Sequence, residues 1–331
     1  MSRLFPLPDV ARAMSSTFEA AGASASISAP VAHAILTNEA EANPICGFFY
    51  LPIFLEQIRS GRINATARPE IIREHGAAVT IDAAEGFAQP AIELASDWLR
   101  RAAKREGIAV ARIVNSYNSL ALSGMTEPLA TAGFVAMAFS NSPAAMSQGG
   151  AARAYYGTNP FSLAAPRPAG APIVIDQSAS IATKTAIMMA RDEGKPIPEG
   201  WACDNAGEPT TDPQAALGGY ILPAGGQHGA NWALVVEILS AALTAGPLSV
   251  EAAALGDAKA PHPRLGQLML AIDPGGGDVN AFADTMHRLV TLIDADPALR
   301  LPGERRFLAA QTARRDGIAV PDDIAELIGL R

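Results

Sequence analysis

The order in which helix and strand patterns follow one another is the feature that most constrains the fold of this chain. Helical periodicity fills most of the first hundred residues, short apolar runs occupy the middle, and helical patterns return at the end. The strongest strand signals are the nearly continuous apolar runs at 108–114 and 134–140, because strands buried on both faces lose polar alternation. This order predicts a mixed α/β core wrapped by terminal helices.

The individual elements follow from local periodicity and from the residues that end each run. Helices are predicted at 10–21, 29–42, 50–60, 86–106, 125–132, 180–191, 232–243 and 279–293, with a mostly helical tail at 304–331. Strands are predicted at 77–81, 108–114, 134–140, 162–165, 173–176 and 267–273. The stretch 192–226 is rich in Pro, Gly and Asp and is predicted to be a long loop, a kind of segment that is often functional.

Composition excludes several classes of protein. The chain has 331 residues, 49% of them hydrophobic, which is enough for two domains or one elaborated domain. Its net charge of −8 and the absence of a basic stripe argue against nucleic-acid binding. No long apolar segment or signal peptide is present, so we expect a cytoplasmic protein that does not enter a membrane. Two cysteines and five scattered histidines predict neither a disulfide framework nor a metal site.

Three loops stand out for their glycine, asparagine and proline content next to predicted strands. They are the stretch 149–160, which ends in Gly157-Thr158-Asn159-Pro160, the stretch 200–213 and the stretch 223–229, which leads directly into a helix. Loops of this kind expose backbone N–H groups and can bind phosphates, although each alone is better explained as a tight turn. Neither the GxGxxG fingerprint of Rossmann enzymes nor a P-loop occurs in the chain.

Taken together, these motifs resemble the malate/L-lactate dehydrogenase-like (type 2) oxidoreductases. The resemblance rests on the Gly157–Pro160 loop, on IVIDQSAS at 173–180, on IPEGWACDNAGEPTTDP at 197–213 and on Gly-Gly-Gln-His-Gly at 225–229. It extends over roughly 39–306, where Pro302-Gly303-Glu304 is similar to the family's closing motif. The family includes reductases of 2-oxo acids and of the cyclic imines Δ1-piperideine-2-carboxylate and Δ1-pyrroline-2-carboxylate, and the chain looks closest to the imine reductases.

The resemblance implies a fold, a cofactor and an assembly. The implied fold is an α/β (α+β) nicotinamide-binding architecture that is not a Rossmann fold, with a mixed, mostly antiparallel central sheet. One domain would comprise 1–113 with 279–331, for substrate binding and dimerisation, and the other 114–278, for NAD(P) binding. The implied cofactor is NADPH or NADH, of which we favour NADPH, and the implied partners are a small-molecule substrate and a second copy in a homodimer.

The resemblance also assigns site residues. The positions expected to bind the cofactor are Asn118, Ser119, Leu120, Thr158, Asn159, Pro160, Ser180, His228 and Gly229. Asp176 matches an aspartate near the family's catalytic centre. Hydride transfer depends mostly on positioning, and the reduced product also needs a proton from a general acid.

The catalytic corner departs from the family pattern. In Ile45-Cys46-Gly47-Phe48-Phe49-Tyr50, Cys46 stands where the family has its acid histidine and Tyr50 where it has a carboxylate-binding arginine. Asn118 replaces a second histidine, and His228 replaces a lysine. Cys46 is a poor acid and is equally well explained as a small buried residue. We therefore predict Cys46, Tyr50 and Asp176 as the catalytic set, with Asp176 as the proton relay.

Three hypotheses of function follow. The first is a reductase of a small cyclic imine carboxylate or 2-oxo acid, in which Arg153 or Arg167 could replace the missing arginine. An imine suits this site, since it is protonated more easily than a ketone. The second is a cofactor-binding homologue with altered or lost catalytic activity. The third is an enzyme that reuses the pocket for chemistry other than reduction.

Overall fold

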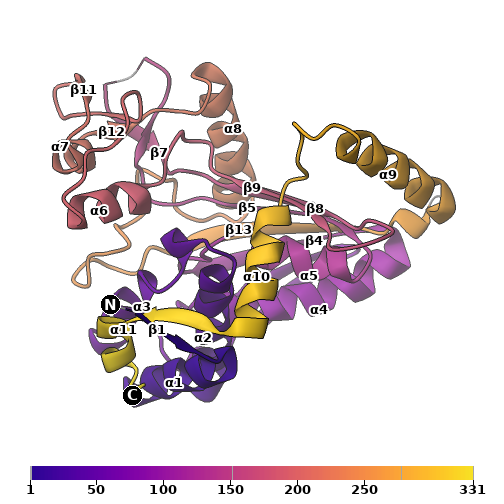
Figure 1. Cartoon of the computed structure of the whole chain (residues 1–331), viewed down its shortest axis with the longest axis horizontal. Coiled ribbons are helices and arrows are strands. Elements are labelled where there is room, and N and C mark those ends of the chain that lie inside the picture. Colours follow the sequence, from indigo (N-terminus) through magenta and orange to yellow (C-terminus); the bar gives the residue numbers. More distant parts are fainter. Residues whose placement is uncertain (1, 151, 277, 331) are drawn as a thin grey trace.

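A seven-stranded sheet forms the centre of the protein (Figure 1). The computed structural model describes residues 2–150, 152–276 and 278–330. The strands are, in order across the sheet, β2 (Glu70–His75), β3 (Ala78–Asp82), β4 (Ile108–Ser116), β13 (Leu265–Ile272), β5 (Val135–Ser140), β8 (Phe161–Ala165) and β9 (Ile173–Gln177). Among these neighbours, β3 and β4 run parallel and the other pairs are antiparallel. The predicted mixed, mostly antiparallel sheet is confirmed.

Helices cover both faces of the sheet, but not equally. Helices α4 (Ala88–Glu106) and α5 (Ser123–Thr131) pack on one face, where Leu99 and Met125 meet the small residues Ala136 and Ala138 of β5. On the other face α8 (Gln227–Glu237) continues into a π-helical turn, η2 (Ile238–Ala242), and contributes Val236 to a smaller cluster. Successive side chains along each central strand point to opposite faces of the sheet, so they contact these two helical layers alternately.

The two chain ends together form the helical layer below the sheet. It contains α1 (Leu7–Ala20), α2 (Ala25–Ala40), α3 (Tyr50–Arg59), α10 (Glu304–Asp316) and α11 (Asp322–Leu327). The terminal strands β1 (Ser2–Phe5) and β14 (Ile318–Pro321) pair antiparallel, so the last residues of the chain are fastened to the first. Burial of Phe18, Phe54 and Val320 in one cluster confirms that the termini wrap a common core.

A second lobe is built around a five-stranded sheet. Its strands, in order, are β11 (Pro209–Thr210), β10 (Ala202–Cys203), β12 (Tyr220–Ile221), β6 (Met146–Ser147) and β7 (Ala154–Tyr156). Helices α6 (Lys184–Asp192) and α7 (Pro213–Gly218) close a small apolar core around Ile187, Ile197 and Ile221. The stretch 192–226, which was predicted as a long loop, is ordered because its few apolar residues supply this core.

Helix α9 (Val279–Asp294) differs from the other long helices, since it projects from the body of the chain (Figure 1). None of its described residues is buried, and Leu292 is 72% exposed although the helix is strongly amphipathic. A long apolar stripe facing solvent is typical of a surface that meets another protein.

Several element boundaries differ from those predicted. The helix predicted at 180–191 begins at Lys184, where the Thr183 hydroxyl accepts a hydrogen bond from the Ala186 N–H and caps it. The helix predicted from 232 begins at Gln227. Strand β2 was not predicted because all six of its residues are exposed at the sheet edge, so it has no apolar alternation. The tail is helical except for β14.

Candidate active site

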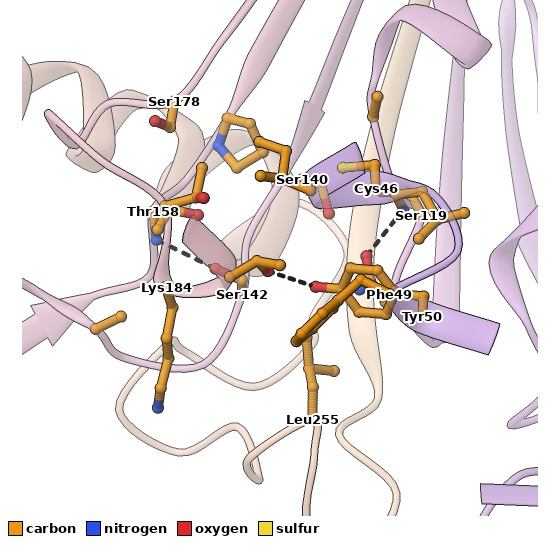
Figure 2. Close-up of a pocket in the computed structure, with 18 of the residues that line it drawn as sticks. Cys46, Phe49, Tyr50, Ser119, Ser140, Ser142, Thr158, Ser178, Lys184 and Leu255 are labelled. Carbon is orange, nitrogen blue, oxygen red and sulfur yellow. Dashed lines mark hydrogen bonds between the residues drawn. The ribbon is translucent and has the colours of Figure 1, made fainter. Parts of the chain in front are cut away.

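A cavity of about 1210 Å³ opens where the helical layer, the central sheet and the second lobe meet. Its walls come from segments far apart in sequence: the turn before α3, the loop after β4, the ends of β5 and β9, the start of α6, the segment 254–259 and the start of α10. Figure 2 shows Cys46, Phe49 and Tyr50 on one side of this cavity, with Thr158 and Ser178 on the other. Most of the residues predicted to form the site are therefore brought together.

The turn that carries Cys46 is held by a carboxylate from α2. This turn contains a short 3-10 helix, η1 (Pro44–Cys46), and the Phe48 N–H donates to Glu39 Oε2 at 2.8 Å. Any side chain at Gly47 would collide with that carboxylate, which explains the glycine of the motif. Burial raises the pKa of Glu39, although the Phe48 N–H opposes the shift. The position of Cys46 is thus determined by packing and one hydrogen bond.

The catalytic corner offers no charge of its own. Burial and the nearby Asp176 raise the pKa of Cys46 to about 12, and burial and Cys46 raise the pKa of Tyr50 to about 12. Both groups therefore keep their protons at neutral pH. The Tyr50 ring packs between Phe49 and Phe54, and its hydroxyl lies 3.0 Å from Thr185 Oγ1. A thiol and a phenol in this state can donate hydrogen bonds but cannot neutralise an anion.

Asp176 is the group best suited to hold a transferable proton. It lies near the end of β9, where Oδ2 accepts the Ser123 N–H at 2.7 Å, and it lines the cavity. Burial raises the pKa of Asp176 above its ordinary value, while the Ser123 N–H and the positive charge of Arg306 act in the opposite direction. A carboxyl group in such surroundings can act as a general acid nearer neutral pH than an exposed one.

Arg306 lines the cavity beside Asp176 but is already engaged. Its Nε lies 3.0 Å from Glu41 Oε2, and its Nη2 lies 3.1 Å from Glu127 Oε2. Two carboxylates therefore share one guanidinium. The arginines suggested by the sequence as carboxylate anchors lie outside the cavity lining: Arg167 pairs with Glu304 at 3.7 Å, and Arg153 contacts Tyr155.

The residues predicted to bind the cofactor divide into two groups. Those that line the cavity are Asn118, Ser119, Leu120, Thr158, Pro160 and Ser180. Figure 2 shows Thr158 beside Ser142, whose Oγ accepts the Thr158 N–H at 3.2 Å. This contact joins the Gly157–Pro160 loop to the end of β5.

The other three lie outside the lining. Asn159 is fully buried, and its amide donates to Glu237 Oε2 at 2.8 Å and to Ala233 O at 3.0 Å. Gly229 is packed so closely against Ala179 O and Ala224 O that a side chain would not fit. His228 is exposed at the start of α8. Asn159 and Gly229 thus shape the loops, while Ala224 of the same glycine-rich segment reaches the cavity.

Several cavity residues were missed by the sequence reasoning. They are Ser142, Lys184, Thr185, Arg305, Arg306 and the segment 254–259. Lys184 makes no ion pair in the described part of the chain, and burial lowers its pKa. A lone lysine or threonine at the start of a helix is indistinguishable in sequence from a surface residue. The one signal was the IVIDQSAS motif, which ends at Ser180, a few residues before Lys184.

The cavity suits a nicotinamide dinucleotide with a substrate. Its volume exceeds the ~300–1,000 Å³ that is usual for one small ligand. Hydroxyl groups from Ser119, Ser140, Ser142, Thr158 and Ser178 surround it, as ribose and phosphate groups require (Figure 2). Lys184, Lys259 and Arg305 at its wall supply positive charge for phosphates. The described residues therefore fit the cofactor that the resemblance implies.

A central sheet without the Rossmann strand order, a cavity large enough for a dinucleotide and a buried carboxyl group at its wall agree with the architecture that the resemblance implies. The family model described as malate/L-lactate dehydrogenase matches residues 5–328, and the chain belongs to that family. Family membership implies a nicotinamide cofactor.

Curated relatives and solved structures agree with this assignment. A Δ1-pyrroline-2-carboxylate/Δ1-piperideine-2-carboxylate reductase of Pseudomonas putida is 36% identical, over 98% of this chain and 95% of the relative. A (2R)-3-sulfolactate dehydrogenase (NADP(+)) of Chromohalobacter salexigens is 35% identical, over 98% and 97%. The structure of Δ1-piperideine-2-carboxylate reductase from Pseudomonas syringae superposes with a TM-score of 0.93 at 32% identity, covering 99% and 100%.

The helices give one further result. Among the described residues, none of the helices has the length and apolar character needed to cross a bilayer.

Proposed function

We propose that this oxidoreductase reduces a small cyclic imine carboxylate or a 2-oxo acid, and that the imine is the preferred substrate. The observation that carries the proposal is the buried, cavity-lining carboxyl group of Asp176, whose pKa is raised, next to loops that fit a nicotinamide dinucleotide. The named activities of the relatives support the same substrate class.

In this proposal the residues of the chain position the substrate and supply a proton. When bound, NAD(P)H supplies the hydride that is added to the substrate carbon. Asp176 holds a proton and donates it to the imine nitrogen or carbonyl oxygen, then regains one from solvent. Phe49, Ile53 and Leu255 form an apolar wall that excludes water. Cys46 and Tyr50 remain neutral, and Tyr50 contributes a hydrogen bond.

An imine needs a weaker acid than a ketone does, because its nitrogen is far more basic than a carbonyl oxygen. The site has lost the histidine expected from the family and retains a carboxyl group. This combination favours the imine over the 2-oxo acid. The sulfolactate dehydrogenase relative keeps the 2-oxo acid as the second candidate.

NADPH is the cofactor that we favour over NADH. Lys184, Lys259 and Arg305 line the cavity and make no ion pair in the described part of the chain, so they can bind an additional phosphate. The sulfolactate dehydrogenase relative is named for NADP(+). We assign Ser119, Leu120, Thr158 and Pro160 to direct contact with the cofactor.

The proposed biological unit is a cytoplasmic homodimer. The exposed apolar stripe of α9 supports this, and a second copy would cover it. The division into a helical substrate and dimerisation domain, 1–113 with 279–331, and a cofactor domain, 114–278, is part of the same proposal. Light scattering on the purified protein should give twice the chain mass, and Leu292→Asp should shift it toward one chain.

The alternative of a cofactor-binding homologue without activity is not favoured, because the similar curated proteins are named reductases and dehydrogenases. The test is to follow oxidation of NADPH and NADH after adding Δ1-piperideine-2-carboxylate, Δ1-pyrroline-2-carboxylate or pyruvate. We expect the cyclic imines to be reduced fastest. Binding of the nucleotide without oxidation by any of the three would count against the proposed reaction.

A further inference from the structure

Two hydrogen-bonded pairs line the wall of the catalytic corner. In the first, the Leu120 N–H donates to Asn118 Oδ1 at 2.8 Å. In the second, the Tyr50 hydroxyl lies 3.0 Å from Thr185 Oγ1. Asn118, Tyr50 and Thr185 all line the cavity, and Thr185 is buried.

The orientation of the Asn118 amide is fixed by the first pair. A backbone N–H can only donate, so the Asn118 atom that it contacts must be the amide oxygen. In the second pair either hydroxyl can be the donor. In both cases one of the two hydroxyl protons lies outside the shared hydrogen bond.

The Tyr50–Thr185 pair therefore keeps one donor, for which no acceptor is seen among the described residues. Both residues line the cavity, so this donor can serve a ligand there. The arrangement is completed by a ligand atom that accepts a hydrogen bond.

The charges around the corner narrow the choice of that ligand atom. Arg306 is shared between Glu41 and Glu127, and Figure 2 shows the Lys184 side chain extending away from Cys46 and Tyr50. A carboxylate on a substrate that reacts beside Asp176 would therefore find the hydroxyl groups of Tyr50 and Thr185 at this wall.

We propose that Thr185 is a substrate-binding residue, and that its hydroxyl, in the pair with Tyr50, donates to the carboxylate of the substrate. The inference rests on the proposed function, since it assumes a carboxylate substrate. According to this inference, neutral hydrogen-bond donors recognise the substrate carboxylate. A neutral donor discriminates weakly between a carboxylate and a carboxamide, because both present an acceptor oxygen.

The experiment compares Thr185→Val, which removes the donor at nearly constant shape, with Thr185→Ser, which keeps it. Steady-state kinetics with NADPH and Δ1-piperideine-2-carboxylate should show a KM for the imine about tenfold or more higher in Thr185→Val, with a smaller change in kcat. Thr185→Ser should stay within about threefold of the wild type. The wild-type chain should use the corresponding carboxamide with a kcat/KM within about tenfold of the acid.

The outcomes separate the inference from the function on which it rests. An unchanged imine KM in Thr185→Val would overturn the role of Thr185 and leave the reductase intact. A higher KM for NADPH with an unchanged imine KM would also overturn it, because the donor would then serve the cofactor. Failure of the wild-type chain to oxidise NADPH with any imine would overturn both.

Discussion

The two ends of the active-site cavity differ in the kinds of groups that line them. At the cofactor end, hydroxyl groups and backbone N–H groups converge, and the Gly157–Pro160 loop is joined to β5 through Ser142 and Thr158. At the catalytic end, Cys46, Phe49 and Tyr50 form a neutral, largely apolar wall around Asp176. The proposed cofactor end keeps the Gly157–Pro160 loop expected of the family, whereas Cys46 and Tyr50 at the catalytic end stand where a histidine and an arginine are expected.

The contrast indicates how this family can change substrate without losing its cofactor. Binding of a dinucleotide depends on many small contacts spread over several loops, so it survives single changes. Recognition and protonation of the substrate depend on a few groups. Exchanging two of them can therefore change which substrate is bound and which group donates the proton. Substitutions that act on one end at a time can therefore separate cofactor binding from chemistry.

Asp176→Asn should have the largest effect, because it removes the transferable proton while leaving an oxygen for the Ser123 N–H. General-acid catalysis contributes about 10²–10⁴-fold, so kcat for the imine should fall by at least about 100-fold. The dissociation constant of NADPH, measured by nicotinamide fluorescence, should stay within about threefold of the wild type. A variant that keeps its turnover would show that the proton comes from elsewhere.

The same substitution should stabilise the folded protein at neutral pH. The pKa of Asp176 is raised in the folded state, so the native chain binds the proton more tightly than the unfolded chain does. The wild-type protein therefore loses stability as pH rises from its ordinary value near 3.8 through the raised one. Thermal unfolding at pH 7.5 should give a higher Tm for Asp176→Asn, and this advantage should vanish at pH 4. Equal Tm values at pH 7.5 would contradict the raised pKa.

Gly157→Ala should damage the cofactor end alone. A side chain at Gly157 would collide with the hydroxyl and the carbonyl of Ser142, so the two loops would have to separate. Overpacking of this kind costs about 1–3 kcal/mol. If separation of the loops weakens NADPH binding by the same amount, its KM should rise about 5- to 140-fold. The KM for the imine should change much less, and Gly124→Ala offers a matched control, because open space surrounds that glycine and its φ is not positive.

Lys184→Ala should reveal the preference between nucleotides. If Lys184 binds the additional phosphate, the KM for NADPH should rise about three- to tenfold, since the lysine is partly screened by solvent. The KM for NADH should be unchanged, because NADH lacks that group. Lys259→Ala is the comparison, as it alters a second exposed lysine of the same cavity. Equal changes for both nucleotides would assign Lys184 to a different contact.

Cys46→Ala should have the smallest effect. The pKa of the thiol, about 12, makes it neither an acid nor a nucleophile at neutral pH. We expect kcat for the imine within about threefold of the wild type, measured beside Asp176→Asn. A loss of kcat as large as that of Asp176→Asn would show that Cys46 acts as the general acid in place of the missing histidine.

The sequence predicted the central strands and the family well, because the long apolar runs and the successive loop motifs are local signals. It did not predict the exposed edge strand β2 or the terminal pair β1 and β14, since their pairing depends on contacts distant in sequence. It placed Cys46, Tyr50 and Asp176 around one cavity. It missed Thr185 and Lys184, because what distinguishes them is their neighbours in space.

The measurement that tests the central claim most directly is a fluorescence titration of the wild-type protein with NADPH, followed by addition of Δ1-piperideine-2-carboxylate while absorbance at the nicotinamide band is recorded. We predict saturable binding and then oxidation of the bound nucleotide, with Asp176→Asn binding equally and oxidising little. Absence of nucleotide binding, or equal oxidation by the two proteins, would contradict the account of an intact cofactor end serving an Asp176-dependent reaction.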